Sequence, residues 1–268
     1  MFYKVYCIAV IMAKSGIILA SGGLDSGVTA YYAKKKLGYD KLLFLFFDYG
    51  QRALKEEEYC SRELAKNLGA DFKKIELKWL GGISTALLNK DGEMPDVNED
   101  ELGNIEKGKK DVLNYWVPCR NSVFLIAALA HAEALFLSGK EKPDVFIGLK
   151  CEGRIPMKDT TPEFVKAMNK LAEEATNDGG YKVIAPLIDY DKDEIVKLGC
   201  ELKVPFELTY SCYAGNKGHQ RPPYQPCATT KKKIPVHCGG CENCVQRKKG
   251  FYWAGVEDRS VYAKYNIC

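Results

Sequence analysis

The chain has 268 residues, of which 46% are hydrophobic and 28% charged, and its formal net charge is +4. This composition is typical of a globular protein and excludes a disordered or fibrous chain. The small net charge argues against a dedicated nucleic-acid binder with a broad basic face, so we interpret the lysine runs at 34–36 and 231–233 as solvated surface. The first apolar stretch, 5–13, is too short to cross a bilayer, and no membrane association is expected.

The first part of the chain alternates short apolar runs with helical patterns. The apolar runs predict buried strands at 17–20, 41–47 and 72–77, and the helical patterns predict helices over 26–34 and 54–68. This alternation is typical of an α/β fold with an open, mostly parallel, doubly wound sheet and helices on both faces. In such a sheet the ligand site lies at the carboxyl ends of the strands.

The rest of the chain continues this pattern as far as Thr209. Residues 79–116 show no period, and we expect a lid or a binding insertion there. Further helices are expected at 121–137, 162–175 and 191–202, and a further strand at 145–148. From Ser211 the chain is rich in Gly, Pro, Lys and Cys without apolar periodicity, so we expect a main domain over 14–209 and a small C-terminal region over 210–268.

The sequence SGGLDS at 21–26 lies between the first strand and the first helix. Glycines at such a turn let several backbone N–H groups and the positive helix end face an anion, which predicts a phosphate site. The segment matches neither G-x-x-x-x-G-K-[ST] nor G-x-G-x-x-G. It resembles the SGGxDS PP-loop of the ATP pyrophosphatase superfamily, whose fold is adenine nucleotide alpha hydrolase-like and whose members split ATP between the α and β phosphates.

That resemblance implies an ATP site at the end of the first strand. The residues expected to hold the nucleotide are Leu19, Ala20, Ser21, Gly22, Gly23, Leu24, Asp25, Ser26, Gly27 and Val28, with Phe46, Phe47 and Asp48 facing the adenine. Asp25 is negative, so we expect it to contact Mg²⁺ or an N–H group rather than phosphate, or else to cap the helix.

Eleven cysteines are present, and three of them, Cys238, Cys241 and Cys244, have C-x2-C-x2-C spacing. Such thiolates converge on one tetrahedral ion, which needs a fourth ligand. Cys212 and Cys227 are the candidates, with His237 and His219 behind them; a structural zinc is expected, and an iron–sulfur cluster is the alternative. The remaining scattered cysteines indicate a reducing compartment, and we expect a cytoplasmic protein.

Taken together, the two motifs resemble the 7-cyano-7-deazaguanine synthases of the same superfamily. The matching pieces are DYGQ at 48–51, VPCRN at 117–121, DTTPEF at 159–164, PL at 186–187, DKDEI at 191–195, SCY at 211–213, CGGCENC at 238–244, Arg247 and GF at 250–251. The likeness spans about residues 15 to 255 and selects Cys212 as the fourth zinc ligand. Two departures are present: 25 residues separate Cys212 from Cys238, more than in the family, and Met157, Lys158 and 149–152 differ where the substrate is expected.

The resemblance implies that 7-carboxy-7-deazaguanine, ammonia and ATP give 7-cyano-7-deazaguanine through adenylated intermediates, for queuosine or archaeosine. Lys192, Asp25 and Arg120 are the expected catalytic residues, and Lys192 would contact phosphate unless it is a surface lysine. Arg120 and Asn121 would hold the nucleotide or the substrate carboxylate, or only cap a helix. Asp159 and Glu163 would accept hydrogen bonds from the guanine-like edge or hold Mg²⁺, although for Glu163 we favour stabilisation by the helix dipole.

Two other functions compete with this one. A tRNA-modifying PP-loop enzyme would use the same adenylate chemistry for thiolation or amino-acid ligation, but it needs a larger basic surface or free catalytic cysteines. A zinc-ribbon module that binds nucleic acid is suggested by the basic runs 231–233 and 247–249, but it leaves SGGLDS unexplained. We therefore expect small-molecule substrates and no direct nucleic-acid contact, with a homodimer left open.

Overall fold

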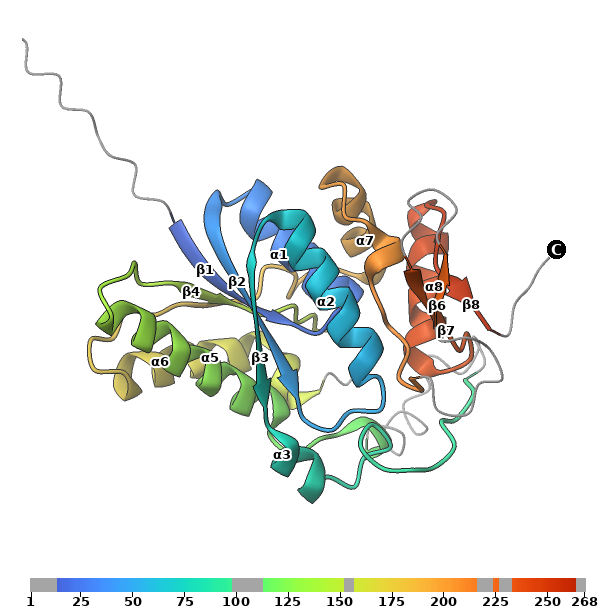
Figure 1. The fold of residues 1–268 in the computed structure, drawn as a ribbon, viewed down its shortest axis with the longest axis horizontal. Coiled ribbons are helices and arrows are strands. Elements are labelled where there is room, and N and C mark those ends of the chain that lie inside the picture. Colours follow the sequence, from blue (N-terminus) through green and yellow to red (C-terminus); the bar gives the residue numbers. More distant parts are fainter. Residues whose placement is uncertain (1–13, 98–112, 152–156, 216–223, 227–232, 264–268) are drawn as a thin grey trace, which may run out of the picture.

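The protein is described here by a computed structural model that covers residues 14–97, 113–151, 157–215, 224–226 and 233–263. Of the sequence-based predictions, the stretch 5–13, the alternative ligands His219 and Cys227, and Lys231 and Lys232 lie outside these described residues. Figure 1 shows the main sheet with helices on both faces and the smaller C-terminal region beside it.

Five parallel strands form the main sheet in the order β3-β2-β1-β4-β5. The strands are β1 (Lys14–Ala20), β2 (Tyr39–Asp48), β3 (Asp71–Glu76), β4 (Asp144–Phe146) and β5 (Val183–Ile184). The chain builds outward from β1 to β3 and then continues on the other side of β1. The strand order therefore reverses between β1 and β4, which is where open α/β sheets bind their ligands.

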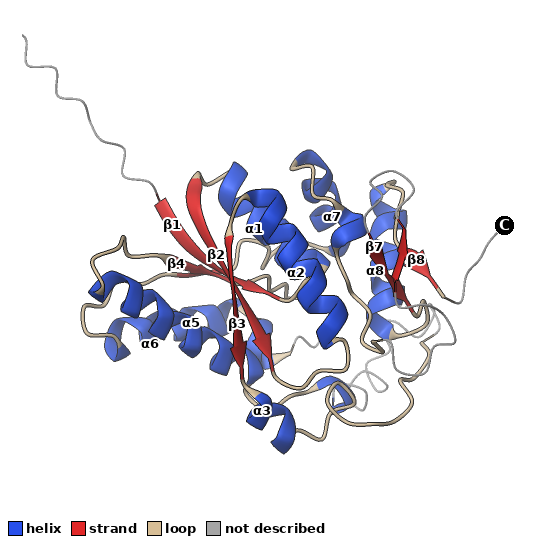
Figure 2. Cartoon of the chain, in the orientation of Figure 1, coloured by secondary structure: helices blue, strands red, loops and turns tan. Residues whose placement is uncertain are grey.

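Helices cover both faces of this sheet. They are α1 (Leu24–Lys35), α2 (Leu54–Leu68), α3 (Lys78–Ile83), α5 (Arg120–Leu137), α6 (Pro162–Ala175) and α7 (Lys192–Glu201), with short 3₁₀ turns η2 (Lys158–Thr160) and η3 (Phe206–Leu208). Alternate residues of β1 enter different cores: Ile18 packs with α1, α2 and α7, whereas Ile17 packs with α5 and α6. The predicted doubly wound α/β fold is therefore confirmed (Figure 2).

The helix α5 lies within an apolar segment, Leu113–Leu137, that is long enough by length and composition to cross a membrane. One face of α5, with Leu125, Ala128 and Leu129, is buried in the core that also holds β1 and β4. A helix that covers a sheet needs such an apolar face, although Ile126 and Leu137 of the same helix are exposed.

The C-terminal region is more regular than the sequence suggested. It contains a three-stranded sheet of β6 (Tyr224–Pro226), β7 (Lys233–His237) and β8 (Val261–Tyr262), and the helix α8 (Glu242–Ala254), which packs against α7. The sequence shows no apolar period over this region, and it gave no signal for α8. The helix does have a buried face, which consists of Cys244, Val245, Arg247, Gly250 and Phe251. Because an arginine and a glycine are among these residues, the face cannot be recognised from an apolar pattern. The short helix α3 was likewise missed, and it overlaps the start of the predicted loop 79–116.

Candidate active site

The PP-loop connects β1 to α1 and is shaped by its own two serines. The Ser26 hydroxyl accepts hydrogen bonds from the Ser21 amide (3.3 Å) and the Ser21 hydroxyl (3.0 Å), and donates to the Gly23 carbonyl (3.1 Å). The Gly23 amide in turn donates to the Ser21 hydroxyl at 3.2 Å. The loop is therefore a compact turn at the N-terminus of α1, where N–H groups and the helix dipole favour an anion.

The position of Gly22 is constrained by segments on both sides. Its φ is +70°, and a Cβ added there would lie 2.3 Å from the carbonyl oxygen of Glu57 in α2. The Gly22 carbonyl accepts a 2.7 Å hydrogen bond from the amide of Tyr210, two residues before Cys212. Only glycine fits this close approach without displacing the loop.

Asp25 and Lys192 meet beside the PP-loop. The Lys192 ammonium donates to both carboxylate oxygens of Asp25 at 2.9 Å, and the Lys192 side chain is only 16% exposed. Asp25 lies in the first turn of α1, whose N-cap is Gly23, so the prediction that Asp25 caps the helix is wrong. Lys192 lies in the first turn of α7 and pairs with Asp25 beside the loop, and its contact with phosphate stays a prediction.

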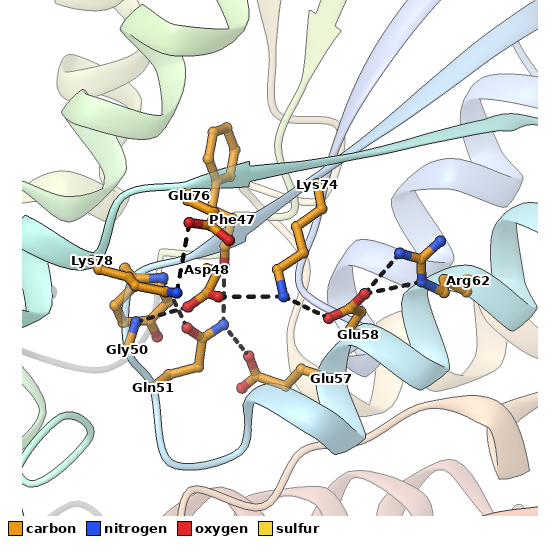
Figure 3. A network of polar contacts seen from close by, with 11 residues as sticks. Phe47, Asp48, Gly50, Gln51, Glu57, Glu58, Arg62, Lys74, Glu76 and Lys78 are labelled. Carbon is orange, nitrogen blue, oxygen red and sulfur yellow. Dashed lines mark hydrogen bonds and ion pairs between the residues drawn. The ribbon is translucent and has the colours of Figure 1, made fainter.

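Asp48 ends β2 and is the buried centre of a polar network (Figure 3). Its carboxylate accepts from the Gly50 amide at 3.2 Å and pairs with the Lys74 ammonium at 3.2 Å. Lys74 also pairs with Glu58 at 2.9 Å, and the hydrogen bond to Glu58 raises the pKa of Lys74. Asp48 is thus held rigidly at the carboxyl end of the sheet; its predicted contact with adenine stays a prediction.

Arg120 begins α5 and lies at the same carboxyl edge. It hydrogen-bonds the Tyr49 hydroxyl and is also close to Tyr213 and Asp159. The Asn121 side chain donates to the main-chain oxygen of Asp159 at 3.2 Å. Cys119 is the N-cap and makes no side-chain hydrogen bond, so capping does not account for Arg120 and Asn121. Burial raises the pKa of Asp159, and the charge of Arg120 opposes that rise.

Glu163 is placed differently from the other predicted substrate residues. It is exposed in the first turn of α6, where the helix dipole stabilises a carboxylate, and the N-cap Thr161 accepts a 3.2 Å hydrogen bond from Phe164 N. The structure thus agrees with the helix-dipole alternative that the sequence favoured. A role of Glu163 in substrate binding has no support from this position.

Two ionisable residues at this edge, one half-buried and one buried, were missed from the sequence. Glu57, in the first turn of α2, accepts a 3.0 Å hydrogen bond from the Gln51 side chain, and burial raises its pKa to about 7. Lys150 follows β4 and is 8% exposed; burial, and then the charge of Lys192, lower its pKa to about 7. Perturbed groups of this kind gather at functional sites, but the burial that perturbs them is not visible in a sequence.

Four cysteines form the candidate metal centre. The sulfur atoms of Cys212, Cys238, Cys241 and Cys244 all lie within 4.8 Å of one another, and the four residues are buried. A tetrahedral zinc with Zn–S bonds of about 2.3 Å places its sulfurs roughly 3.8 Å apart, which fits this spacing. The amides of Gly240 and Cys241 donate to the sulfur of Cys238, and hydrogen bonds from the other three thiols lower the pKa of Cys238.

The alternative histidine ligand has another role. His237 is buried, accepts a 3.1 Å hydrogen bond from the Ser211 amide through Nε2, and contacts the rings of Tyr210 and Tyr262. Among the described residues, the cluster that can hold a metal consists of the four cysteines alone. The structure therefore brings Cys212 to the C-x2-C-x2-C segment across the intervening residues.

Arg247 of α8 connects this cluster region to the main domain. It is 1% exposed and pairs with Asp258 at 2.9 Å. The same guanidinium donates to the Thr209 hydroxyl at 2.7 Å and to the Phe206 carbonyl at 3.1 Å. Thr209 directly precedes Tyr210, whose amide bonds Gly22. The segment from Thr209 to Cys212 is therefore fixed at one end by Arg247 and at the other by the four-cysteine cluster.

The solved structures to which this chain is similar include two proteins that act on tRNA or RNA. One is the U34-tRNA thiolase NcsA from Methanococcus maripaludis with its [4Fe-4S] cluster. Its TM-score is 0.41 and its sequence identity 18%, and the match covers 72% of this chain and 57% of the thiolase chain. Another is a 4-thiouridine synthetase in complex with RNA and bound ATP. Its TM-score is 0.42 and its sequence identity 19%, and the match covers 75% of this chain and 43% of the synthetase chain. We draw no functional conclusion from likenesses this distant.

Sequence relatives are much closer. The chain is 36% identical over 252 residues to the 7-cyano-7-deazaguanine synthase of Methanobrevibacter smithii, covering 94% of this chain and 99% of the relative. It is 34% identical over 256 residues to the 7-cyano-7-deazaguanine synthase of Pyrococcus furiosus, covering 94% and 98%. Residues 15–255 match the family model described as queuosine biosynthesis protein QueC. With relatives at this identity along nearly its whole length, this chain belongs to the QueC family.

Proposed function

We propose that this protein is a 7-cyano-7-deazaguanine synthase that uses ATP and ammonia to convert 7-carboxy-7-deazaguanine into the nitrile. The observation that carries the proposal is the meeting, at one edge of the sheet, of the PP-loop with its Asp25–Lys192 pair and the cluster around Arg120. The first suits a polyphosphate and the second suits a carboxylate. The names of its full-length relatives support the same substrate.

The reaction consists of two successive adenylations, each on an oxygen atom bound to the same carbon. A carboxylate oxygen attacks the α phosphorus of ATP and pyrophosphate leaves; ammonia then displaces AMP, losing a proton, to give the amide. The amide oxygen attacks the α phosphorus of a second ATP, pyrophosphate leaves again, and loss of AMP and of both protons of the amide nitrogen gives the nitrile. Both carboxyl oxygens leave on AMP, so the protein acts as an ATP-dependent ligase that forms a carbon–nitrogen bond.

In this scheme the residues position reactants and stabilise charge. The amides of the PP-loop and the Lys192 ammonium would hold the phosphates and the departing pyrophosphate, and Arg120 would orient the carboxylate toward phosphorus. Asp25 orients Lys192 through the ion pair described above. Mg²⁺ is expected to arrive with ATP; since both oxygens of Asp25 accept from Lys192, we assign no protein ligand to it.

A zinc ion in the four-cysteine site would be structural. All four positions of a tetrahedron are filled by thiolates, so no position is left for substrate. The short sulfur–sulfur distances support a single ion over a cluster, which must fit several iron atoms between the same thiolates. An ion there would stabilise the segment from Thr209 to Cys212, and the division into domains 14–209 and 210–268 remains our proposal.

Two further points belong to this proposal. The described cysteines form no disulfides, and thiolates kept reduced suit the cytoplasm. A homodimer is open to measurement by sedimentation; Tyr252 and Trp253, exposed on α8 at 76% and 69%, are surfaces where a second copy would be sought.

The test measures release of AMP and pyrophosphate with 7-carboxy-7-deazaguanine plus ammonium, with bulk tRNA as the rival substrate, and identifies the nitrile by mass spectrometry. We expect release only with the deazapurine, and two ATP consumed per nitrile. Lys192→Met should abolish release, whereas Lys197→Met, in an exposed pair on the same helix, should not. Release only with tRNA would overturn the proposal in favour of tRNA modification, and no release with either substrate would favour a binding module.

A further inference from the structure

Lys192 is the first residue of α7, and the helix α8 of the C-terminal region passes directly across its side chain. The two helices pack against each other (Figure 1). A Cβ added to Gly250 in α8 would lie 2.4 Å from Cγ of Lys192, 3.3 Å from its Cβ and 3.4 Å from its main-chain oxygen. A side chain at position 250 would therefore occupy the space that the Lys192 stem fills.

The Lys192 side chain is thus held at two places. Its ammonium donates to both carboxylate oxygens of Asp25 at 2.9 Å, and its stem lies against the backbone of α8 at Gly250. A free lysine side chain samples many rotamers, and a ligand that orders it loses that entropy on binding. A lysine whose stem is already fixed meets its ligand with less of this loss.

The helix α8 is itself fixed close to Gly250. Arg247, one turn earlier, is 1% exposed and pairs with Asp258 at 2.9 Å. Cys244, in the first turn of α8, is buried in the four-cysteine cluster. Moving α8 would disturb both sets of contacts, whereas the Lys192 stem can rotate about several bonds. A methyl group at Gly250 should therefore displace the lysine and leave α8 in place.

We propose that Gly250 is a positioning residue for Lys192: by lacking a side chain, it lets α8 hold the lysine stem so that the ammonium stays beside the PP-loop. The inference rests on the ATP site of the proposed function and adds to it a residue of the C-terminal region. Alanine is the better helix former, so without this contact Gly250→Ala would stabilise α8 and leave ligand binding unchanged.

The first test is calorimetric binding to the full-length, metal-loaded protein, with MgATP, pyrophosphate and adenosine as separate probes. Gly250→Ala should bind MgATP and pyrophosphate at least about tenfold more weakly, the usual effect of weakening a hydrogen bond to a charged group, and adenosine like wild type. Gly255→Ala is the matched control, because Gly255 ends the same helix at φ +68° and a Cβ there would have no atom within 4 Å. It should bind all three probes like wild type.

A double-mutant cycle separates positioning of Lys192 from general damage to the site. Lys192→Met alone should weaken pyrophosphate binding about 10- to 100-fold. If Gly250 acts through Lys192, adding Gly250→Ala to Lys192→Met should weaken binding no further. If the two losses add, so that the double variant binds about tenfold more weakly than Lys192→Met, the inference is overturned. Thermal unfolding checks that each variant is folded.

A measurement on the wild type decides the question even if Gly250→Ala does not fold. NMR relaxation of ¹³C-labelled lysines in the nucleotide-free protein reports the mobility of each stem on the picosecond-to-nanosecond scale. The Cγ of Lys192 should be rigid, whereas that of Lys197, whose side chain is 52% exposed on the same helix, should be mobile. Equal mobility at the two positions would contradict a stem held by α8.

Wild-type affinity for pyrophosphate in Gly250→Ala would also overturn the inference, as would a wild type that binds neither MgATP nor pyrophosphate. The outcome for the proposed function is distinct from this one. A wild type whose MgATP affinity depends on Lys192 and Gly250, but which makes no nitrile, would overturn the proposed function and leave this inference standing.

Discussion

The PP-loop and the four-cysteine centre are two candidate functional regions among the described residues, and they are built in opposite ways. The loop is one contiguous segment, shaped by hydrogen bonds among Ser21, Gly23 and Ser26, and Ser21 is exposed to incoming ligand. The cysteine centre joins two distant segments, and each of its side chains is at most 4% exposed. A site that exchanges its ligand at each turnover needs an open side, whereas a site that keeps an ion for structure does not.

The two regions are nevertheless joined by a few residues. Tyr210 hydrogen-bonds Gly22, and Cys212 follows only two residues later. Arg247 holds the same segment from α8. The four-cysteine centre is therefore connected to the PP-loop through the segment from Thr209 to Cys212, and variants at each end should separate their contributions.

The largest effect is expected from Cys212→Ser, which removes one thiolate from the centre. Because zinc binding in small sites contributes on the order of 10 kcal/mol, the variant should lose its metal and much of its thermal stability. Elemental analysis and calorimetry measure both. Cys60→Ser is the matched control, since Cys60 is equally buried in the same apolar cluster but is not among the four ligands; it should keep the metal. Metal retained by Cys212→Ser would make the ligand set wrong.

A smaller loss is expected from Arg247→Met. Removing one partner of a buried pair leaves the charge of Asp258 uncompensated, which costs about 3–5 kcal/mol of unfolding free energy. Arg62→Met, whose pair with Glu58 is exposed, should cost about 1 kcal/mol or less. Denaturant unfolding of both variants gives the comparison. Equal losses would mean that Arg247 does not support the loop segment as described.

Gly22→Ala tests the open site itself. The new Cβ meets the Glu57 carbonyl at 2.3 Å, so the loop must shift, at a cost of about 1–3 kcal/mol and with at least about tenfold weaker ATP binding. Gly38→Ala is the matched control, because Gly38 also has a positive φ, +73°, but a Cβ added there would have no atom within 4 Å. It should lose about 1 kcal/mol and keep its ATP affinity. Wild-type affinity in Gly22→Ala would show that the close approach has no part in nucleotide binding.

The smallest effect concerns pH. Burial raises the pKa of Glu57 to about 7 from 4.5, so the folded state retains a proton that the unfolded state loses. Glu57 therefore costs no stability below about pH 4.5, and an increasing amount as pH rises to about 7. Glu57→Gln should be more stable than wild type at pH 8 and equal to it at pH 4. The exposed Glu201→Gln is the control, and a Glu57→Gln difference that does not vary with pH would contradict the assignment.

Local signals in the sequence were enough for the main elements. The helix expected over 54–68 has those bounds in the structure because it is amphipathic and ends at Gly69, which adopts the left-handed conformation. The helix α8 was missed because Arg247 and Gly250 occupy buried positions that an apolar pattern reserves for hydrophobic residues. Its arginine is stable there only because Asp258 and Thr209 lie opposite, and those contacts are tertiary.

The same distinction holds for the site. The sequence by itself determined a PP-loop between strand and helix, and three thiols with metal spacing, because both are fixed by residues close together in the chain. Only the tertiary contacts show that Cys212 completes the four-cysteine cluster, that Lys192 pairs with Asp25, and that the half-buried Glu57 and the buried Lys150 lie near the loop. Those relations depend on which strands are neighbours and where their carboxyl ends meet, and no local pattern contains that information.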